Sequence, residues 1–154
     1  MISKVRINMI EASKVNSVEV AESPETDTAA NNIEIEVRVR YPECDPMNVV
    51  HHAVYPVWME MARTELLRKR GFTYRNIEVA GHFFAVAKLN VKYLKPAFYD
   101  DLLTIKAEIK PTAGVKIEHL YEIHRGNEII CRGETTVVCV DRNGKLQPIP
   151  EILR

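Results

Sequence analysis

Segment 41–55, YPECDPMNVVHHAVY, gathers the side chains of this chain that are best suited to chemistry. It contains two carboxylates, one thiol and two adjacent imidazoles: Glu43, Asp45, Cys44, His51 and His52. These groups suit a metal site, a cysteine nucleophile, or a carboxylate that attacks a carbonyl or accepts a proton from water. Their spacing, and the elements that position them, discriminate among these possibilities.

A metal ion needs three or four ligands that converge on one point. The four ligating side chains at positions 44, 45, 51 and 52 are too crowded along the chain to converge easily. The remaining histidines, His82, His119 and His124, form no ligand-spacing motif. We therefore expect no metal site, and no other cofactor is indicated.

The cysteines are poor candidates for a nucleophile. In an extended segment neighbouring side chains face opposite ways, so Cys44 should point away from a ligand that Asp45 faces. Cys131 and Cys139 are eight residues apart in one expected strand, which places both on the same face as core residues. Three cysteines without CxxC spacing argue against a disulfide framework and favour a reducing compartment.

The reactive segment lies between a strand and a helix. Residues 33–40 alternate apolar and charged types, which predicts a half-buried strand. Residues 53–70 change to helical spacing, with Pro56 in the first turn and Gly71 as the stop. The apolar stripe of this helix is expected to comprise Val54, Trp58, Met61, Ala62 and Leu66, together with Glu65.

The rest of the chain predicts strands at 83–93, 102–110, 115–124 and 128–140, with a short helical turn at 74–79. In the first of these strands, alternation places Phe83, Ala85, Ala87, Leu89, Val91 and Tyr93 on one face. Short connections make the four strands antiparallel neighbours, and one long amphipathic helix must be buried against them. The expected fold class is α+β, with a curved antiparallel sheet of about five strands around a central helix.

Composition limits the class of protein further. The 154 residues carry 21 basic and 21 acidic side chains, so nothing suggests a broad nucleic-acid footprint. Residues 1–31 are expected to form a flexible extension, followed by one domain over residues 32–154. No apolar run is long enough to span a bilayer, and no secretory signal is expected. We expect a cytoplasmic location, with organellar import as the alternative because the first residues are partly basic.

Four consecutive motifs carry a family resemblance: RVRY at 38–41, ECDP at 43–46, VVHHAVY at 49–55 and RTELL at 63–67. This succession resembles the hotdog-fold acyl-CoA thioesterases of the 4-hydroxybenzoyl-CoA thioesterase and YbgC-like group. The likeness covers residues 33–145, and VKYLKPAFYDD at 91–101 adds to it. It implies hydrolysis of an acyl-CoA or acyl-carrier-protein thioester.

The resemblance also implies roles for two residues of the reactive segment. Asp45 would act as nucleophile or as general base for water, and His52, seven residues later, would stabilise the oxyanion through its backbone N–H at the helix start. The alternatives are structural: Asp-Pro commonly begins a turn, and His52 would simply pack at the helix start. His51 stands where relatives tend to carry an aromatic residue, so we expect it to fill a wall.

Substrate-binding residues follow from the same resemblance. Tyr55 matches an aromatic position of the acyl pocket, and Trp58 lies one turn further along the helix, where a core role is equally compatible with its position. Lys110 and Lys116, with Arg125, are expected to meet the nucleotide phosphates, although lysines are by default solvated surface charges.

Hotdog domains pair their sheets edge to edge, so the resemblance implies a homodimer or homotetramer with sites between subunits. Two other functions stay open. One is an acyl-thioester hydratase or dehydratase of the same fold, whose motifs we do not find. The other is a non-catalytic acyl-thioester binding module, which would not need Asp45.

Overall fold

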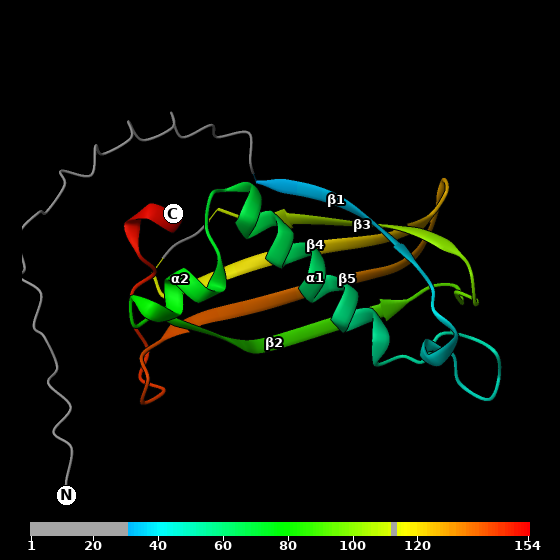
Figure 1. The fold of residues 1–154 in the computed structure, drawn as a ribbon, viewed down its shortest axis with the longest axis horizontal. Coiled ribbons are helices and arrows are strands. Elements are labelled where there is room, and N and C mark those ends of the chain that lie inside the picture. Colours follow the sequence, from blue (N-terminus) through cyan, green and yellow to red (C-terminus); the bar gives the residue numbers. More distant parts are fainter. Residues whose placement is uncertain (1–30, 112–113) are drawn as a thin grey trace, which may run out of the picture.

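The computed structural model describes residues 31–111 and 114–154. Two α-helices and five strands account for most of this part of the chain (Figure 1). The strands are β1 (Asn32–Arg38), β2 (Phe83–Tyr93), β3 (Leu102–Ile109), β4 (Lys116–Arg125) and β5 (Glu128–Val140). The helices are α1 (Val54–Lys69) and α2 (Tyr74–Val79), and short 3-10 turns occur at Tyr41–Glu43 and Glu151–Leu153. The elements predicted from the sequence are confirmed, with bounds that shift by two residues at most.

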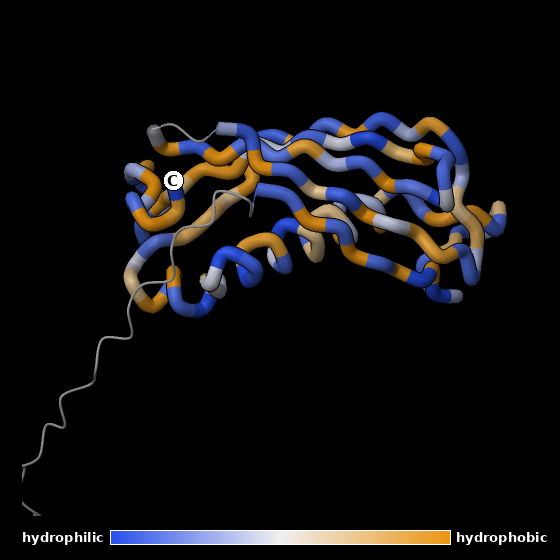
Figure 2. The backbone as a smooth tube through the Cα atoms, turned by 90° about the horizontal axis from the view of Figure 1, so that it is seen from above, coloured by the Kyte–Doolittle hydropathy of each residue, from blue (hydrophilic) through white to orange (hydrophobic). Residues whose placement is uncertain are grey.

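The strands form one antiparallel sheet in the order β1-β3-β4-β5-β2. The sheet curves around α1, which lies across one of its faces (Figure 1). Hydrophilic and hydrophobic residues alternate along the strands (Figure 2), as a sheet with one covered face requires. The structure therefore has the α+β architecture of the hotdog fold that the resemblance implied.

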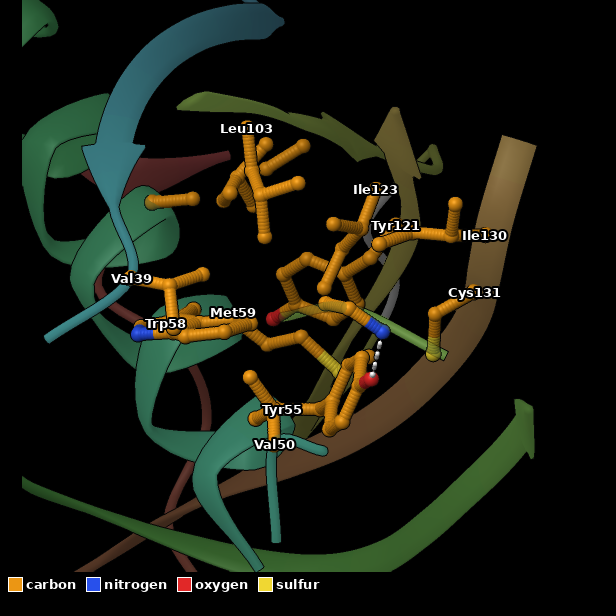
Figure 3. Packing of buried hydrophobic residues seen from close by; sticks show 14 of the residues in the cluster. Val39, Val50, Tyr55, Trp58, Met59, Leu103, Tyr121, Ile123, Ile130 and Cys131 are labelled. Carbon is orange, nitrogen blue, oxygen red and sulfur yellow. Dashed lines mark hydrogen bonds between the residues drawn. The ribbon is translucent and has the colours of Figure 1, made fainter. Parts of the chain in front are cut away.

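Helix α1 buries a stripe that differs in part from the predicted one. Its fully buried side chains are Tyr55, Trp58, Met59, Ala62 and Leu66, which pack against apolar residues of β3, β4 and β5 (Figure 3). The expectation that Met61 belongs to the stripe is wrong, because this side chain is 45% exposed. Spacings of three and four fit both sets of residues, and only the position of the sheet selects between them.

A β-bulge at Ala87 corrects the predicted face of β2. Pairing with β5 shifts between Val86 and Lys88, so one extra residue is accommodated there. Leu89 and Tyr93 lie on the α1 side as expected, opposite Thr135 and Cys131. Before the bulge the alternation is inverted: Phe84, not Phe83, packs with Cys139 in the core.

The end of the chain closes the core at the α2 end of the sheet. Ile149 and Leu153 are 1% and 2% exposed and pack with Ile77, Ile117 and Cys139. The sequence makes no prediction for residues 147–154, because so short a segment carries no usable period. Both Cys131 and Cys139 are fully buried, as expected for core residues.

Two further expectations concern the chain as a whole. The flexible extension predicted over residues 1–31 lies, except for Asn31, outside the described residues. Within the described residues, neither helix has the length and apolar character needed to cross a bilayer.

Candidate active site

Asp45 begins a tight turn beside the start of α1. Its backbone N–H donates to the Val49 carbonyl over 2.9 Å, while its own carbonyl accepts from Asn48. Cys44 and Val50 form an antiparallel bridge across the base of the turn. Asn48 has φ +62°, a left-handed conformation that asparagine tolerates better than most residues. The short hairpin explains how Asp45 and the helix start come together in space.

The carboxylate of Asp45 is half-buried and only partly engaged. Oδ1 accepts a 2.8 Å hydrogen bond from the backbone N–H of Met47, as in an Asx turn. Oδ2 receives no hydrogen bond from the described residues. The turn-capping role considered from the sequence is therefore present, and it leaves one oxygen for another task.

The His52 N–H group, just before α1, has no hydrogen-bond acceptor among the described residues. His51 fixes its surroundings: its carbonyl accepts from the Val54 N–H over 3.0 Å, and its Nδ1 accepts from the Ala53 N–H over 3.2 Å. The neutral ring therefore carries its proton on Nε2. The ring of His51 thus accepts a hydrogen bond from the backbone before α1 and is exposed, and it does not fill a wall of the site within this chain.

Tyr93 is a site residue that the sequence reasoning missed. Its hydroxyl group donates a 2.8 Å hydrogen bond to the carbonyl oxygen of His52. Its ring also meets the Tyr55 ring edge-on, with centroids 5.1 Å apart. The only signal in the sequence was its place at the inward-facing end of β2.

Glu43 holds the Asp45 hairpin in place. Its buried carboxylate accepts from the Arg40 backbone N–H at 2.7 Å, from the Arg40 guanidinium at 2.8 Å, and from Trp58 Nε1 at 3.4 Å. Burial alone would raise the pKa of Glu43, but the hydrogen bonds and the charge of Arg40 lower it below its usual value. The Glu43 carbonyl also accepts from the His51 N–H over 2.9 Å, which ties the hairpin to this buried anchor.

The two predicted aromatic residues lie beneath the site. Tyr55 and Trp58 are 3% and 1% exposed, and their rings contact each other with centroids 5.2 Å apart. The Tyr55 hydroxyl accepts from the Ala97 N–H over 3.4 Å (Figure 3), and burial raises the pKa of this phenol. In this chain both rings support the helix start from the core side, and contact with an acyl group stays a prediction.

The structure does not bring the predicted lysines to Asp45 within one chain. Lys110 follows β3 and Lys116 begins β4, at the end of the sheet where α1 ends (Figure 1). Asp45 lies at the other end, beside the start of α1. Arg125 does lie at the Asp45 end, where it contacts Asp101 at 2.9 Å and Glu128 at 2.7 Å.

Large apolar side chains are exposed around the Asp45 end of the molecule. They come from residues 41–47 and from the end of β2 with the segment that follows it: Tyr41, Met47, Tyr93, Leu94, Phe98 and Tyr99. Backbone contacts join the two segments, with the Val50 N–H donating to the Ala97 carbonyl over 2.9 Å. An exposed apolar patch beside polar groups is typical of a surface that binds a ligand or a partner.

Neither the cysteines nor a metal cluster adds to this site. Cys44 is partly buried against the hydrophobic core. Burial raises the pKa of Cys131 to about 12, which keeps its thiol protonated. Within residues 31–111 and 114–154, no group of three histidine, cysteine or acidic side chains is arranged to hold a metal ion.

Comparison with known proteins identifies the class to which this fold and site belong. Residues 39–154 match the thioesterase-like superfamily, and the chain belongs to that family. It is 38% identical to the acyl-CoA thioester hydrolase YbgC of Escherichia coli O157:H7 over 68% of this chain and 79% of that protein. The acyl-CoA thioesterase YbgC of Haemophilus influenzae is 34% identical, over 77% and 88%.

Solved structures agree with this assignment. A DHNA-CoA thioesterase from Staphylococcus aureus superposes with a TM-score of 0.73 and 30% sequence identity. The alignment covers 76% of this chain and 80% of the bacterial enzyme.

Proposed function

We propose that this protein hydrolyses acyl thioesters of coenzyme A, or of an acyl carrier protein, to a free acid and a thiol. The observation that carries the proposal is the His52 N–H at the start of α1, which has no acceptor among the described residues and lies at the same end of the molecule as the half-engaged carboxylate of Asp45. The family and the names of the relatives support the same reaction class.

The helix start would stabilise the charge that develops on the thioester oxygen. The His52 N–H has no acceptor among the described residues, and the first turn of a helix adds a positive partial charge. One such donor lowers a barrier by roughly 3 kcal/mol in other hydrolases. The hydrogen bonds of His51 and Tyr93 hold the peptide groups on both sides of His52, so the donor is fixed before substrate binds.

Asp45 would supply the attacking group. In one route Oδ2 attacks the carbonyl carbon, and the departing thiolate takes a proton from water. The hydroxide that remains hydrolyses the mixed anhydride to the free acid and restores the Asp45 carboxylate. In the other, the carboxylate accepts a proton from water, the hydroxide adds to the carbon, and that proton passes to the departing thiolate. Both routes consume one water and give the same acid and thiol.

A homodimer would complete the site. Strand β2 is an outer strand of the sheet, and its α1-facing side chains Val86, Leu89 and Tyr93 are 45–48% exposed. Val57 and Met61 of α1 are exposed at 53% and 45%. Antiparallel pairing of β2 with the same strand of a second copy would satisfy its free edge and cover this apolar surface.

Such pairing would also explain the position of the lysines. Lys116 lies in the same row of the sheet as Val138 and Ala85. The eight steps from Ala85 to Tyr93 span roughly 26 Å along the strand, at about 3.3 Å per residue. A two-fold axis near Leu89 would therefore bring Lys110 and Lys116 of the partner subunit toward the Asp45 end, where the nucleotide of coenzyme A would meet them.

The activity is tested with the full chain and a panel of thioesters. Straight-chain acyl-CoA, aromatic acyl-CoA and acyl-carrier-protein substrates are assayed for release of free thiol. Turnover of at least one substrate is expected. Thioester binding without turnover would favour the binding module, and hydration of an enoyl thioester without thiol release would favour the hydratase. Either result would overturn the proposal.

The dimer is tested separately by Leu89→Glu, with Glu60→Gln on the exposed face of α1 as control. A charge at the proposed seam should convert a dimer into monomer by light scattering, and thiol release should fall with it. A wild-type chain that is monomeric at assay concentration would refute this part of the proposal and leave the reaction class unaffected.

A further inference from the structure

A buried polar cluster lies away from the Asp45 end, where the second half of α1 meets α2, β4 and β5. Arg63 of α1 faces the hydroxyl groups of Tyr74 and Tyr121. Tyr121 shares a 3.0 Å hydrogen bond with Thr135, whose hydroxyl lies 3.5 Å from Nδ1 of His119. The proposed hydrolysis uses none of these groups.

Arg63 is unusual because its guanidinium is buried and incompletely paired. Its side chain is 10% exposed, and Nη2 reaches the solvent-exposed Glu60 over 3.2 Å. Nε is fully buried without a hydrogen-bond partner among the described residues. A buried donor left unpaired costs about 1–3 kcal/mol, and more when the group is charged. Such a donor indicates a partner that the protein itself does not supply.

Arg63 lines a small cavity that has a positive polar lining. The cavity has a volume of about 30 Å³. Its polar lining residues are Arg63, Arg70, Tyr74 and His119, and its other lining residues are apolar: Leu67, Phe84, Ile109, Ile117, Val137 and Leu153. No carboxylate side chain of the described residues belongs to this lining. Glu60 pairs with Arg63 over 3.2 Å but does not line the cavity.

The ionisable groups around the cavity respond to this charge. Burial, followed by the charges of Arg63 and Arg70, lowers the pKa of His119 to about 4, so the ring is neutral at pH 7. Burial also lowers the pKa of Arg70. For Arg63, burial acts downward, but the tyrosine hydroxyls of Tyr121 and Tyr74 leave its pKa raised, which keeps the guanidinium charged. Two cations and neutral donors therefore line this cavity, where Leu67, Arg70, Tyr74 and Phe84 are only partly buried.

We propose that this cavity is a binding site for a small monovalent anion of halide size, held by Arg63 Nε and the charge of Arg70. The volume admits about one or two water-sized species, which excludes phosphate esters and organic acids. A neutral water would satisfy the Nε–H donor but would add no negative charge beside Arg63, which pairs with the exposed Glu60, or beside Arg70, which donates to the Arg154 carbonyl over 3.4 Å. A bound anion would join α1, α2 and β4 through one buried charge, and would stabilise the native state in proportion to its concentration.

The direct test is a crystal of the full chain grown in sodium gluconate and soaked in sodium bromide. Anomalous diffraction at the bromine edge should place a peak in the cavity, within hydrogen-bonding distance of Arg63 Nε. An ordered water at that position with no anomalous signal would overturn the proposal. Bromide peaks confined to the protein surface would count against it in the same way.

A solution test uses matched arginine variants. The melting temperature of the wild type should rise with sodium bromide relative to sodium gluconate at equal ionic strength. Arg63→Gln and Arg70→Gln should lose this rise, whereas Arg68→Gln, on the exposed face of the same helix, should keep it. If Arg63→Gln does not fold, Arg70→Gln carries the comparison. Equal bromide responses in the folded variants and the wild type would refute the site.

Discussion

The Tyr93 hydroxyl group donates a 2.8 Å hydrogen bond to the backbone carbonyl of His52, across 41 positions of sequence. This contact links the last residue of β2 to the residue whose N–H is the proposed oxyanion donor. The Val54 N–H holds the preceding peptide group through the carbonyl of His51. The orientation of the donor therefore depends on the sheet as well as on the helix.

Replacing Tyr93 with phenylalanine should mainly lower kcat. Loss of one hydrogen bond costs about 1 kcal/mol, which corresponds to a decrease of roughly fivefold to tenfold in rate, with little change in KM. Steady-state kinetics on the best thioester of the panel measure the effect. Tyr99→Phe, at an exposed tyrosine of the same end, is the control and should retain wild-type kcat. Equal kcat for both variants would remove Tyr93 from its positioning role.

Asp45→Asn should abolish most of the activity while the fold is retained. The amide keeps an oxygen that can accept from the Met47 N–H, but it neither attacks nor takes a proton, so kcat should fall about 10²–10⁴-fold. Asp100→Asn is the matched control, because Asp100 is exposed at the same end and asparagine accepts its φ of +68°. A rate for Asp45→Asn close to that of the control would assign the chemistry to another group.

His119 should make the protein less stable as pH falls from 6.5 towards 5. Its pKa is about 4 in the folded chain and near 6.5 in the unfolded chain, so the unfolded state binds more protons in this window. The free energy of unfolding should decrease by roughly 1–2 kcal/mol between these pH values because of this group. Denaturant unfolding in halide-free buffer, followed by the fluorescence of Trp58, the single tryptophan, measures the change.

In that measurement, His119→Gln should remove this part of the pH dependence. His124→Gln, on the same strand, corrects for the loss of a histidine. A pH profile of His119→Gln that matches the wild type would show that His119 titrates alike in both states.

Gly133→Ala should destabilise the core beneath α1. A Cβ at this position would lie 2.5 Å from Cε and 2.6 Å from Sδ of Met59, which is fully buried. Forcing Met59 to move should cost roughly 1–3 kcal/mol in denaturant unfolding. In a Met59→Ala background the same substitution should cost much less, and a double-mutant cycle measures the coupling. Additive effects would show that Met59 does not restrict position 133.

Local sequence determined the elements of this protein. Alternation defined the strands, a change to helical spacing defined α1, and Gly71, with φ +87°, ended it where the sequence predicted. The resemblance of segment 41–55 to thioesterases was equally local, because a turn and a helix start position Asp45 and His52 within a few residues. The strands, α1 and the turn that carries Asp45 depend on short-range backbone geometry, which can be read from patterns along the sequence.

Tertiary structure decided the features that depend on pairing between strands far apart in the sequence. The bulge at Ala87 inverted one end of β2, and the end of β2 placed Tyr93 against His52. The sheet also buried Arg63, which helical spacing had placed outside the apolar stripe, and separated Lys116 from Asp45. A pattern along the chain reports which face a residue favours, but not which residue of another strand lies opposite, because register and bulges are set by packing of the whole sheet.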